Sequence, residues 1–474
     1  MGWKNSKLRS LLKAALDRSG NKRFKNHLLQ AIPFWVASLL TGVAAVAFAK
    51  LFSLAENTGK FVFHIASWYL FIVTPLAFLT AWWVVIKFAP YARGSGIPQV
   101  IAAIELAVPR FNAKVNKLLS FRIIIVKMIS CFIMAFGGAI IGREGPTIQI
   151  AGSIFRKVNQ ALPAWWPKIS KRNMIMAGAA AGLAAAFNTP LGGIVFAVEE
   201  LTRTHISYFK TALFTAVIIA GLTAQGLMGP YLYLGYPDVS HLSGIIFFAV
   251  VLTGLSTGLM GSYMSEIILR LLKWKKRVFA NRKQWIYVLI CGLIIAFLAF
   301  FINHQLLGSG KDEMTTVLFT SSKNTDWYFP FLKAGGIIFS FTTGAAGGVF
   351  APSLSAGAGA GAVIGEWLHL SPQNVNLLIL SGMVGFLTGV TRTPFTSAIL
   401  VLEMTDRHNV IFYLMLAGMT AGLAAILVSK HSFYDQLKTH YLLDLRHEDQ
   451  MELSNSADTE EKLKADVDKT LPTV

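Results

Sequence analysis

Charged residues are scarce in this sequence. Only 14% of its 474 residues are Asp, Glu, Lys or Arg, whereas soluble domains hold about a quarter. Hydrophobic residues make up 54%, and the mean hydropathy is +0.54. Cysteine is almost absent: Cys131 and Cys291 lie in apolar segments, and we expect two small core residues rather than a disulfide or a metal-binding pair. The apolar–polar alternation of half-buried strands is missing too. An ordinary soluble domain is therefore excluded.

Apolar runs dominate the chain instead. Several reach about 20 residues, the length that crosses the hydrocarbon core of a bilayer. Four of them cover residues 28–49, 68–86, 244–264 and 285–302. Backbone polar groups in a bilayer must be hydrogen-bonded within the protein, and without strand patterns only helices achieve this. The sequence therefore predicts an all-α protein that crosses the membrane many times.

The net charge of +19 is concentrated in short linkers, so it does not indicate nucleic-acid binding. Residues 1–26 hold eight Lys or Arg against one Asp, and residues 270–283 hold seven Lys or Arg. Basic linkers stay in the cytoplasm, which places both segments there. We expect a transmembrane domain at 27–445, then a polar, acid-rich and disordered cytoplasmic tail at 446–474.

Many of the apolar segments are interrupted by glycine and proline in the same way. A small or polar turn comes first, then a proline, then an apolar helix. The five examples are GSGIPQVIAAIELAV, GREGPTIQIAGSI, NTPLGGIVFAVEEL, GGVFAPSLSAGAGAGAVIG and RTPFTSAILVLEMT. Proline suits the first helical position because its missing N–H needs no partner there. Each segment therefore predicts a helix that begins at membrane depth.

Two of these segments are similar to each other. Residues 177–201 align without gaps to residues 381–405, which pairs Thr189-Pro190 with Thr393-Pro394 and Glu199 with Glu403. A glycine-rich turn ending in proline precedes each copy. Repeated halves with half-helices near the midplane are a common plan of transporters. We expect two inverted-repeat halves, at about 27–230 and 240–445, with many tilted and broken helices.

Helix N-termini at the midplane can bind an anion without any lysine or arginine. Each terminus carries about half a positive charge and several free N–H groups. A full cation would hold a small anion too tightly, whereas dipoles and amides let it leave. Several converging N-termini therefore predict a pathway for a small anion.

Three of the interrupted segments together resemble a known family. GSGIP at 94–98, GREGP at 142–146 and GGVFAP at 347–352 look like the three signature motifs of the CLC family of chloride channels and proton/chloride antiporters. The resemblance extends over about residues 30–445. It implies an all-α fold of two inverted repeats that moves chloride and protons in opposite directions.

The resemblance also implies a chloride site. A serine hydroxyl, backbone amides of the third motif and a tyrosine hydroxyl hold the ion in that family, which here corresponds to Ser95, Val349, Phe350 and Tyr434. Tyr441 is the competing tyrosine. Hydroxyls suit a halide because they donate hydrogen bonds without a fixed charge. The supporting residues implied by the motifs are Gly94, Gly96, Gly142, Arg143, Gly145 and Ala351.

Carboxylates are implied on both sides of that site. Glu144 corresponds to the family's gate, a tethered anion that competes with chloride and leaves when protonated. The inner proton site falls on Glu200 or its neighbour Glu199; the alignment favours Glu200, with Glu199 as the structural partner that recurs as Glu403. Lys127 matches a buried lysine beneath the gate, and its alternative is a side chain that reaches to the membrane surface.

Other functions remain as alternatives. A passive gated chloride channel has the same fold, and the carboxylate at Glu200 argues against it. Ser95 argues against the fluoride-selective branch. An intramembrane hydrolase would need a nucleophile with a base, and no such pair stands out. The resemblance implies a homodimer with one pore per subunit, with apolar outer faces at 190–202 and 394–404. We expect a bacterial inner-membrane transporter without cofactor or metal, with both termini cytoplasmic.

Overall fold

The fold is described from a computed structural model. It describes residues 22–201, 210–229, 232–279, 283–320, 323 and 325–470, with the side chains of 22–27 and 452–470 left aside. Most of the predicted N-terminal segment 1–26 lies outside this part of the chain.

The described residues are almost entirely helical. The first half of the chain contains α2 (Lys22–Ile65), α3 (Leu70–Phe88), α4 (Ile97–Glu105), α5 (Asn112–Leu118), α6 (Phe121–Phe136), α7 (Glu144–Ala161), α8 (Lys171–Phe187), α9 (Pro190–Phe196) and α10 (Lys210–Met228). The second half contains α11 (Ile246–Val278), α12 (Gln284–Phe301), α13 (Lys311–Phe319), α14 (Phe329–Thr342), α15 (Phe350–Trp367), α16 (Pro372–Thr391), α17 (Pro394–Thr405) and α18 (Ile411–Ile426), followed by α19 (Phe433–Thr470). Short 3-10 turns lie at Ser67–Tyr69, Pro90–Ala92, Pro109–Phe111, His304–Leu306 and His408–Val410, and a π-helical turn covers Ala197–Leu201.

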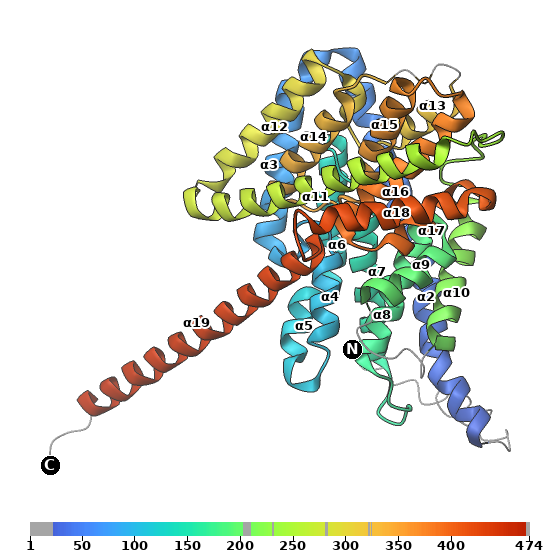
Figure 1. Ribbon diagram of the computed structural model, residues 1–474. Helices are drawn as coiled ribbons and strands as arrows, with labels where there is room; N and C mark the ends of the chain where they lie inside the picture. The colour runs from blue at the N-terminus through green and yellow to red at the C-terminus, as the bar shows by residue number, and fades with distance from the viewer. Residues whose placement is uncertain are drawn as a thin grey trace.

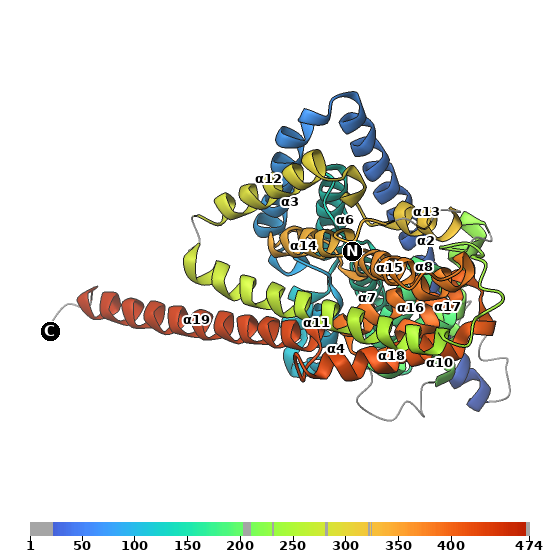
Figure 2. The ribbon, with the colours of Figure 1, turned by 45° about the horizontal axis from the view of Figure 1, so that its top comes forward.

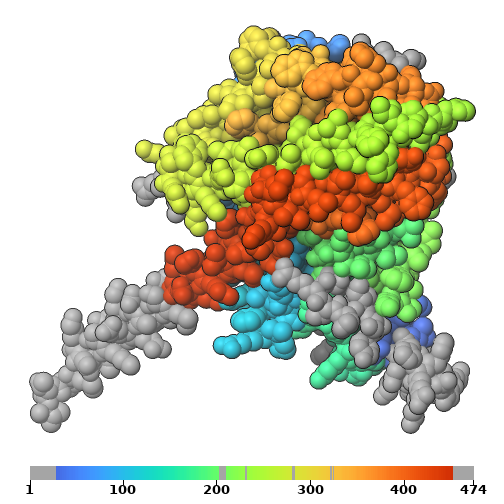
Figure 3. Space-filling model, in the orientation of Figure 1, coloured from blue at the N-terminus to red at the C-terminus, as the bar shows by residue number. Residues whose placement is uncertain are grey.

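Eight helical segments of the described chain are long and apolar enough to cross a membrane. Within the same ranges no β-strand forms; two isolated bridges are the only sheet-like contacts. The predicted all-α, multi-pass architecture is therefore confirmed. Figures 1 and 2 show the helices as a compact bundle in which many axes are tilted against one another. In the space-filling view α11 lies along α18 on one face of the bundle (Figure 3).

Helices rich in alanine and glycine form the centre of the bundle. The apolar window of α16 is 100% buried. A Cβ on Gly357 of α15 would lie 2.2 Å from the carbonyl oxygen of Gly382 in α16, so the two backbones are in contact. Lipid is as apolar as leucine, and membrane helices therefore associate through such close packing. Large apolar side chains of the outer helices, including Leu54, Leu76, Leu222 and Phe297, are exposed.

The predicted repeat is visible in local geometry. The residue after α8 is Asn188 (φ 59°, ψ 42°) and the residue after α16 is Arg392 (φ 64°, ψ 28°), so a left-handed residue caps both helices. The next residues, Thr189 (φ −126°, ψ 80°) and Thr393 (φ −121°, ψ 77°), also have nearly the same conformation. In each copy a proline then starts the short helix, α9 or α17.

The two copies cap each other. Glu199, which follows α9, accepts hydrogen bonds from Phe395 N (3.2 Å) and Thr396 N (2.7 Å) at the start of α17. Glu403 in α17 accepts from Leu191 N (3.0 Å) and Gly192 N (2.7 Å) at the start of α9. Such an exchange of equivalent contacts requires an antiparallel arrangement of α9 and α17, as expected of inverted repeats. Glu199 and Glu403, which the alignment of the two copies places at equivalent positions, thus have equivalent roles as helix caps.

The tail differs from the prediction of disorder after residue 446. Helix α19 starts at the bundle and continues to Thr470 (Figure 1). Its sequence contains no glycine or proline, and it is rich in good helix formers such as Glu, Lys and Leu. Low hydrophobicity alone does not exclude a helix here, because these residues have high intrinsic helix propensity.

Candidate anion site and its carboxylates

The three motifs meet, although long stretches of sequence separate them. Gly94 N donates to Ala345 O at 2.9 Å, and Gly347 N donates to Gly94 O at 3.1 Å. Gly142 N donates to Gly348 O at 2.7 Å, and the reverse bond measures 2.8 Å. The first and second motifs are thus each hydrogen-bonded to the third through their backbones.

A helix begins directly after each of these backbone contacts. Helix α4 starts at Ile97, α7 at Glu144 and α15 at Phe350. The first N–H groups of a helix have no partner within the helix, and the dipole adds partial positive charge there. The motifs therefore bring three helix N-termini into one buried region, which is the arrangement that favours an anion.

Glycine is required where the chains approach most closely. Gly96 has φ +106°, which side-chain-bearing residues rarely adopt. A Cβ on Gly145 would lie 2.1 Å from Ser95 Oγ. A Cβ on Gly142 would lie 2.3 Å from Glu144 Oε2. The glycines of the motifs thus make room for the serine hydroxyl and for the carboxylate.

The predicted hydroxyl donors lie together. Ser95 and Tyr434 are 1% and 0% exposed, and their side chains are close enough to interact. Within the described chain neither hydroxyl makes a hydrogen bond of ordinary geometry. Buried hydroxyls normally have partners, so this pair is suited to a ligand that accepts hydrogen bonds. The competing Tyr441 is engaged elsewhere, because its hydroxyl donates to Arg93 O at 3.4 Å.

Glu144 is the first residue of α7, and its side chain is buried. Its carboxylate lies beside the backbone N–H groups of its own residue and of Ala351, at the start of α15. The carboxylate therefore occupies the region into which two helix N-termini point. No ion pair between Arg143 and Glu144 is found among the described residues, and Arg143 also lies in the electrostatic field of Glu56.

Lys127 is hydrogen-bonded to the segment that carries the first motif. It lies in α6 and is fully buried. Its Nζ donates to Ala92 O at 2.9 Å and to Gly94 O at 2.7 Å. The alternative of a lysine that reaches the membrane surface is therefore wrong. The ammonium fixes the loop that carries Ser95.

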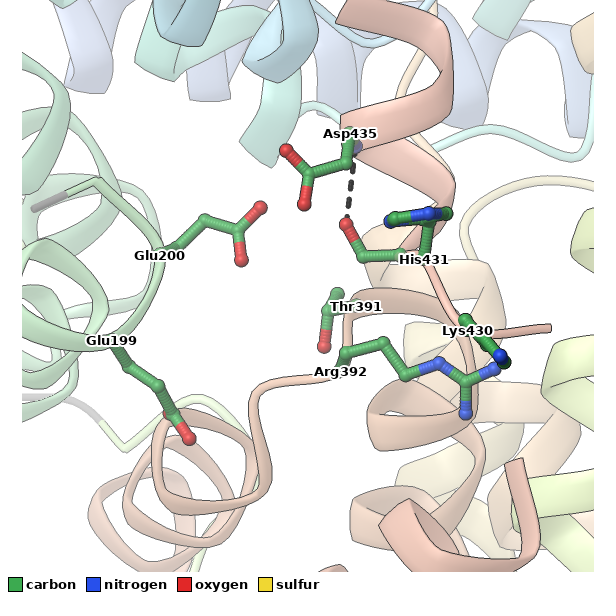
Figure 4. Close-up of a pocket in the computed structure, with 8 residues that line it drawn as sticks. Glu199, Glu200, Thr391, Arg392, Lys430, His431 and Asp435 are labelled. Carbon is green, nitrogen blue, oxygen red and sulfur yellow. Dashed lines mark hydrogen bonds between the residues drawn. The ribbon is translucent and has the colours of Figure 1, made fainter. Parts of the chain in front are cut away.

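The adjacent carboxylates of Glu199 and Glu200 point in different directions. Both lie in the π-helical turn Ala197–Leu201, in which the backbone hydrogen bonds run from i to i+5 instead of i to i+4. Glu199 is directed to the start of α17, where it also accepts from Thr396 Oγ1 at 2.7 Å. Glu200 faces Asp435 across a pocket (Figure 4). The pocket has a volume of ≈ 220 Å³ and is lined by Glu199, Glu200, Thr391, Arg392, Lys430, His431, Ser432 and Asp435.

Residues 76–425 match the sequence profile described as "Voltage gated chloride channel". The chain belongs to the voltage-gated chloride channel family. This family membership agrees with the three motifs and with the fold.

Two relatives of this chain are named H(+)/Cl(-) exchange transporter ClcA. The protein of Klebsiella pneumoniae is 28% identical over 420 residues, which cover 85% of this chain and 86% of the relative. The protein of Salmonella arizonae is 28% identical over 448 residues, which cover 90% and 92%.

Solved structures show the same fold. A slow cyanobacterial Cl-/H+ antiporter is 23% identical, with a TM-score of 0.78 and coverage of 88% of this chain and 98% of that chain. A CLC-type fluoride/proton antiporter is 20% identical, with a TM-score of 0.72 and coverage of 87% and 98%. At these identities the likeness establishes the architecture of this family member and not its ion.

Two further buried lysines near the motifs were missed. Lys333 in α14 donates to Leu306 O at 2.9 Å. Lys275 in α11 donates to Thr342 O at 3.0 Å and to Thr343 O at 2.7 Å, shortly before the third motif. Like Lys127, each lysine holds a turn of the chain by donating hydrogen bonds to the backbone carbonyl oxygens of that turn. For Lys333, the signal was a single lysine inside an apolar run, FPFLKAGGIIF, the same signal that identified Lys127.

Proposed function

We propose that this chain is a proton-coupled chloride antiporter that exchanges chloride for protons across a bacterial inner membrane. The observation that carries the proposal is the buried meeting point of the three motifs. It combines helix N-termini, two hydroxyls without ordinary partners and one buried carboxylate. The relatives named H(+)/Cl(-) exchange transporter support the same activity.

Chloride binds at the meeting point in this proposal. Ser95 and Tyr434 donate their hydroxyls, and the amides of Val349 and Phe350 donate from the start of α15. The ion is held by dipoles and neutral donors, which bind it weakly enough for release. The buried Lys127 contributes through the loop that it fixes rather than by direct contact.

Glu144 is the gate because it competes with chloride for the same amides. An ionised carboxylate is attracted to the N-termini of α7 and α15 and closes the path. Protonation removes this attraction, so the side chain leaves and chloride enters. An arriving chloride favours protonation because like charges repel. One site thus links a proton to anion movement.

Glu200 is the inner proton site. Its carboxylate borders a pocket that it shares with titratable neighbours, including His431 and Asp435 (Figure 4). Glu199 is committed to the start of α17 by three hydrogen bonds and is therefore poorly suited to carry protons. This contrast favours Glu200 over its neighbour.

The functional unit is a homodimer with one pore per subunit and both termini in the cytoplasm. Large apolar side chains project from the repeat helices and their neighbours α10 and α18. Exposed examples are Leu191, Val198, Ile218, Leu222, Phe395, Phe412, Leu423 and Leu427. Membrane helices associate through such faces by packing. Cross-linking in mild detergent that yields monomers alone would contradict this assembly.

Liposome transport tests the proposed exchange. Purified protein is reconstituted with a chloride gradient, and uphill proton movement is followed together with chloride flux. Wild type pumps protons, Glu144→Gln conducts chloride passively without pH dependence, and Glu200→Gln conducts chloride without protons. Chloride flux in wild type without proton movement would favour the passive channel instead. A Glu144→Gln protein that still pumps protons would refute the gate.

A further inference from the structure

The two hydroxyls of the proposed chloride site come from opposite ends of the chain. Ser95 follows α3, whereas Tyr434 lies in the first turn of α19. Their common position therefore depends on how α19 is held against the segment before α4. The contacts of this junction involve Arg93, Tyr441 and Asp444.

Arg93 connects the two parts directly. It lies two positions before Ser95, and its Nη2 is 2.6 Å from Asp444 Oδ2 in α19. Its guanidinium stacks over the ring of Tyr441, with the Cζ atom 4.8 Å from the ring centroid. The Tyr441 hydroxyl in turn donates to Arg93 O at 3.4 Å. An ion pair, a cation–π contact and a hydrogen bond thus join one residue to two residues of α19.

The spacing along α19 makes this contact relevant to Tyr434. Tyr434 and Tyr441 are about two turns apart and therefore lie on the same face of the helix. Tyr434 lies beside Ser95, while Tyr441 contacts Arg93 and lies near Gly94. Two tyrosines on one face thus contact consecutive parts of the first-motif segment. A rotation of α19 that separates Tyr441 from Arg93 also moves the Tyr434 hydroxyl away from Ser95.

Other ion pairs and a hydrogen bond also hold α19 against the body of the protein. Lys276 Nζ is 3.3 Å from Asp444 Oδ1. Glu448 accepts from Tyr91 at 2.7 Å and from Lys117 at 2.9 Å. Lys114 pairs with Asp449, and Lys438 pairs with Glu105 at 2.8 Å. These contacts dock the helix, and among them Lys117 provides a matched control because its ion pair with Glu448 does not include Arg93, Tyr441 or Asp444.

We propose that Arg93 is a positioning residue of the chloride site. Together with Asp444 and Tyr441 it forms a latch that fixes the separation of the Ser95 and Tyr434 hydroxyls. The inference rests on the proposed chloride site and adds a determinant of its affinity that lies outside the three motifs. The latch tunes anion binding through geometry and makes no contact with the ion.

Chloride binding measured by calorimetry in detergent tests the latch, with gluconate replacing chloride to keep the ionic strength constant. The variants are Arg93→Gln, Asp444→Asn and their combination, with Arg93→Lys as the conservative replacement. We expect each single neutral change to weaken chloride binding about threefold to tenfold, as for directly coupled pairs. The double variant should be no weaker than either single one. Arg93→Lys should keep most of the affinity because its charge still faces Asp444.

Thermal unfolding separates positioning from stability. Lys117→Gln should lower the melting temperature about as much as Arg93→Gln while leaving the chloride dissociation constant unchanged. The latch is refuted if Arg93→Gln binds chloride like wild type, or if Lys117→Gln weakens binding equally. The proton-to-chloride ratio in liposomes is a second readout, and it should fall in Arg93→Gln but not in Lys117→Gln. A wild-type protein that binds no chloride would instead overturn the proposed function.

Discussion

Glu199→Ala is expected to destabilise the protein without removing the proton route. The carboxylate accepts three hydrogen bonds at the start of α17, from Phe395 N at 3.2 Å and from Thr396 N and Oγ1 at 2.7 Å each. The substitution removes both acceptor oxygens and with them all three hydrogen bonds. Two amides and a hydroxyl then lose the acceptor that they share in the wild-type protein.

The size of the effect follows from these contacts. Loss of a helix N-cap costs about 0.5–2 kcal/mol, and hydrogen bonds to a charged group contribute about 1.5–3 kcal/mol each. The backbone of Phe395 lies at a partly exposed position, which reduces its share. We therefore expect the free energy of unfolding to fall by about 2–4 kcal/mol. Glu403→Ala, which removes two bonds to α9, should cost somewhat less.

Equilibrium unfolding in detergent measures this loss, and liposome transport measures function in parallel. Glu199→Gln keeps one acceptor oxygen and should fall between wild type and Glu199→Ala. Glu200→Gln serves as the neighbouring control, with unchanged stability and lost proton transport. The reasoning fails if Glu199→Gln unfolds like wild type and yet abolishes proton coupling, because Glu199 would then be the proton carrier and not a helix cap.

Three further outcomes follow from the structure. Gly145→Ala should abolish chloride binding, because the new Cβ would lie 2.1 Å from Ser95 Oγ, whereas Gly152→Ala, with its nearest atom at 3.5 Å, should bind normally in the same calorimetric assay. Lys127→Met should lower both the melting temperature and chloride affinity, because the carbonyls that Lys127 holds at 2.9 and 2.7 Å lose their donor; a variant with unchanged chloride affinity would contradict its support of the Ser95 loop. Burial alone would raise the pKa of Asp444, but Arg93 and Lys276 lower it below its usual value. The stability that the ionised Asp444 contributes is therefore present above the unfolded-state pKa of about 3.9, and it is lost as the pH falls through the lower pKa of the folded state. The difference in melting temperature between wild type and Asp444→Asn should therefore persist at neutral pH and disappear in strong acid, and a difference that vanished between pH 7 and 5 would contradict this assignment.

Features with a local signal were predictable from the sequence. The breaks after α8 and α16 are recognisable because Thr-Pro starts a helix and Asn188 precedes it in one copy. The convergence of the motifs came from family resemblance, since nothing local in GREGP indicates that Gly142 pairs with Gly348. The division of labour between Glu199 and Glu200 depended on alignment, because the sequence does not show the π-helical turn that separates their directions.

What the sequence did not predict is mostly long-range. Arg93 and Asp444 are far apart in the chain, and each is an ordinary surface charge by its local context. The contacts of Lys275 and Lys333 likewise depend on turns formed elsewhere. Residues 446–474 were predicted to be disordered because they contain few hydrophobic residues, although they favour helix, and Glu448 and Asp449 have basic partners on the body.

The backbone bonds between Gly142 and Gly348 also constrain how the protein is made. At about 5–20 residues per second, ribosomal synthesis separates the two glycines by on the order of ten seconds or longer. Until then the N–H and C=O of Gly142 lack their final partners, and each unsatisfied group costs several kcal/mol in hydrocarbon. The broken segment before α7 therefore needs temporary hydrogen-bond partners until α15 has been synthesised. Water or the insertion machinery can supply them. A nascent chain halted before residue 348 exposes this unfinished backbone, which distinguishes it from a finished molecule for cellular quality control.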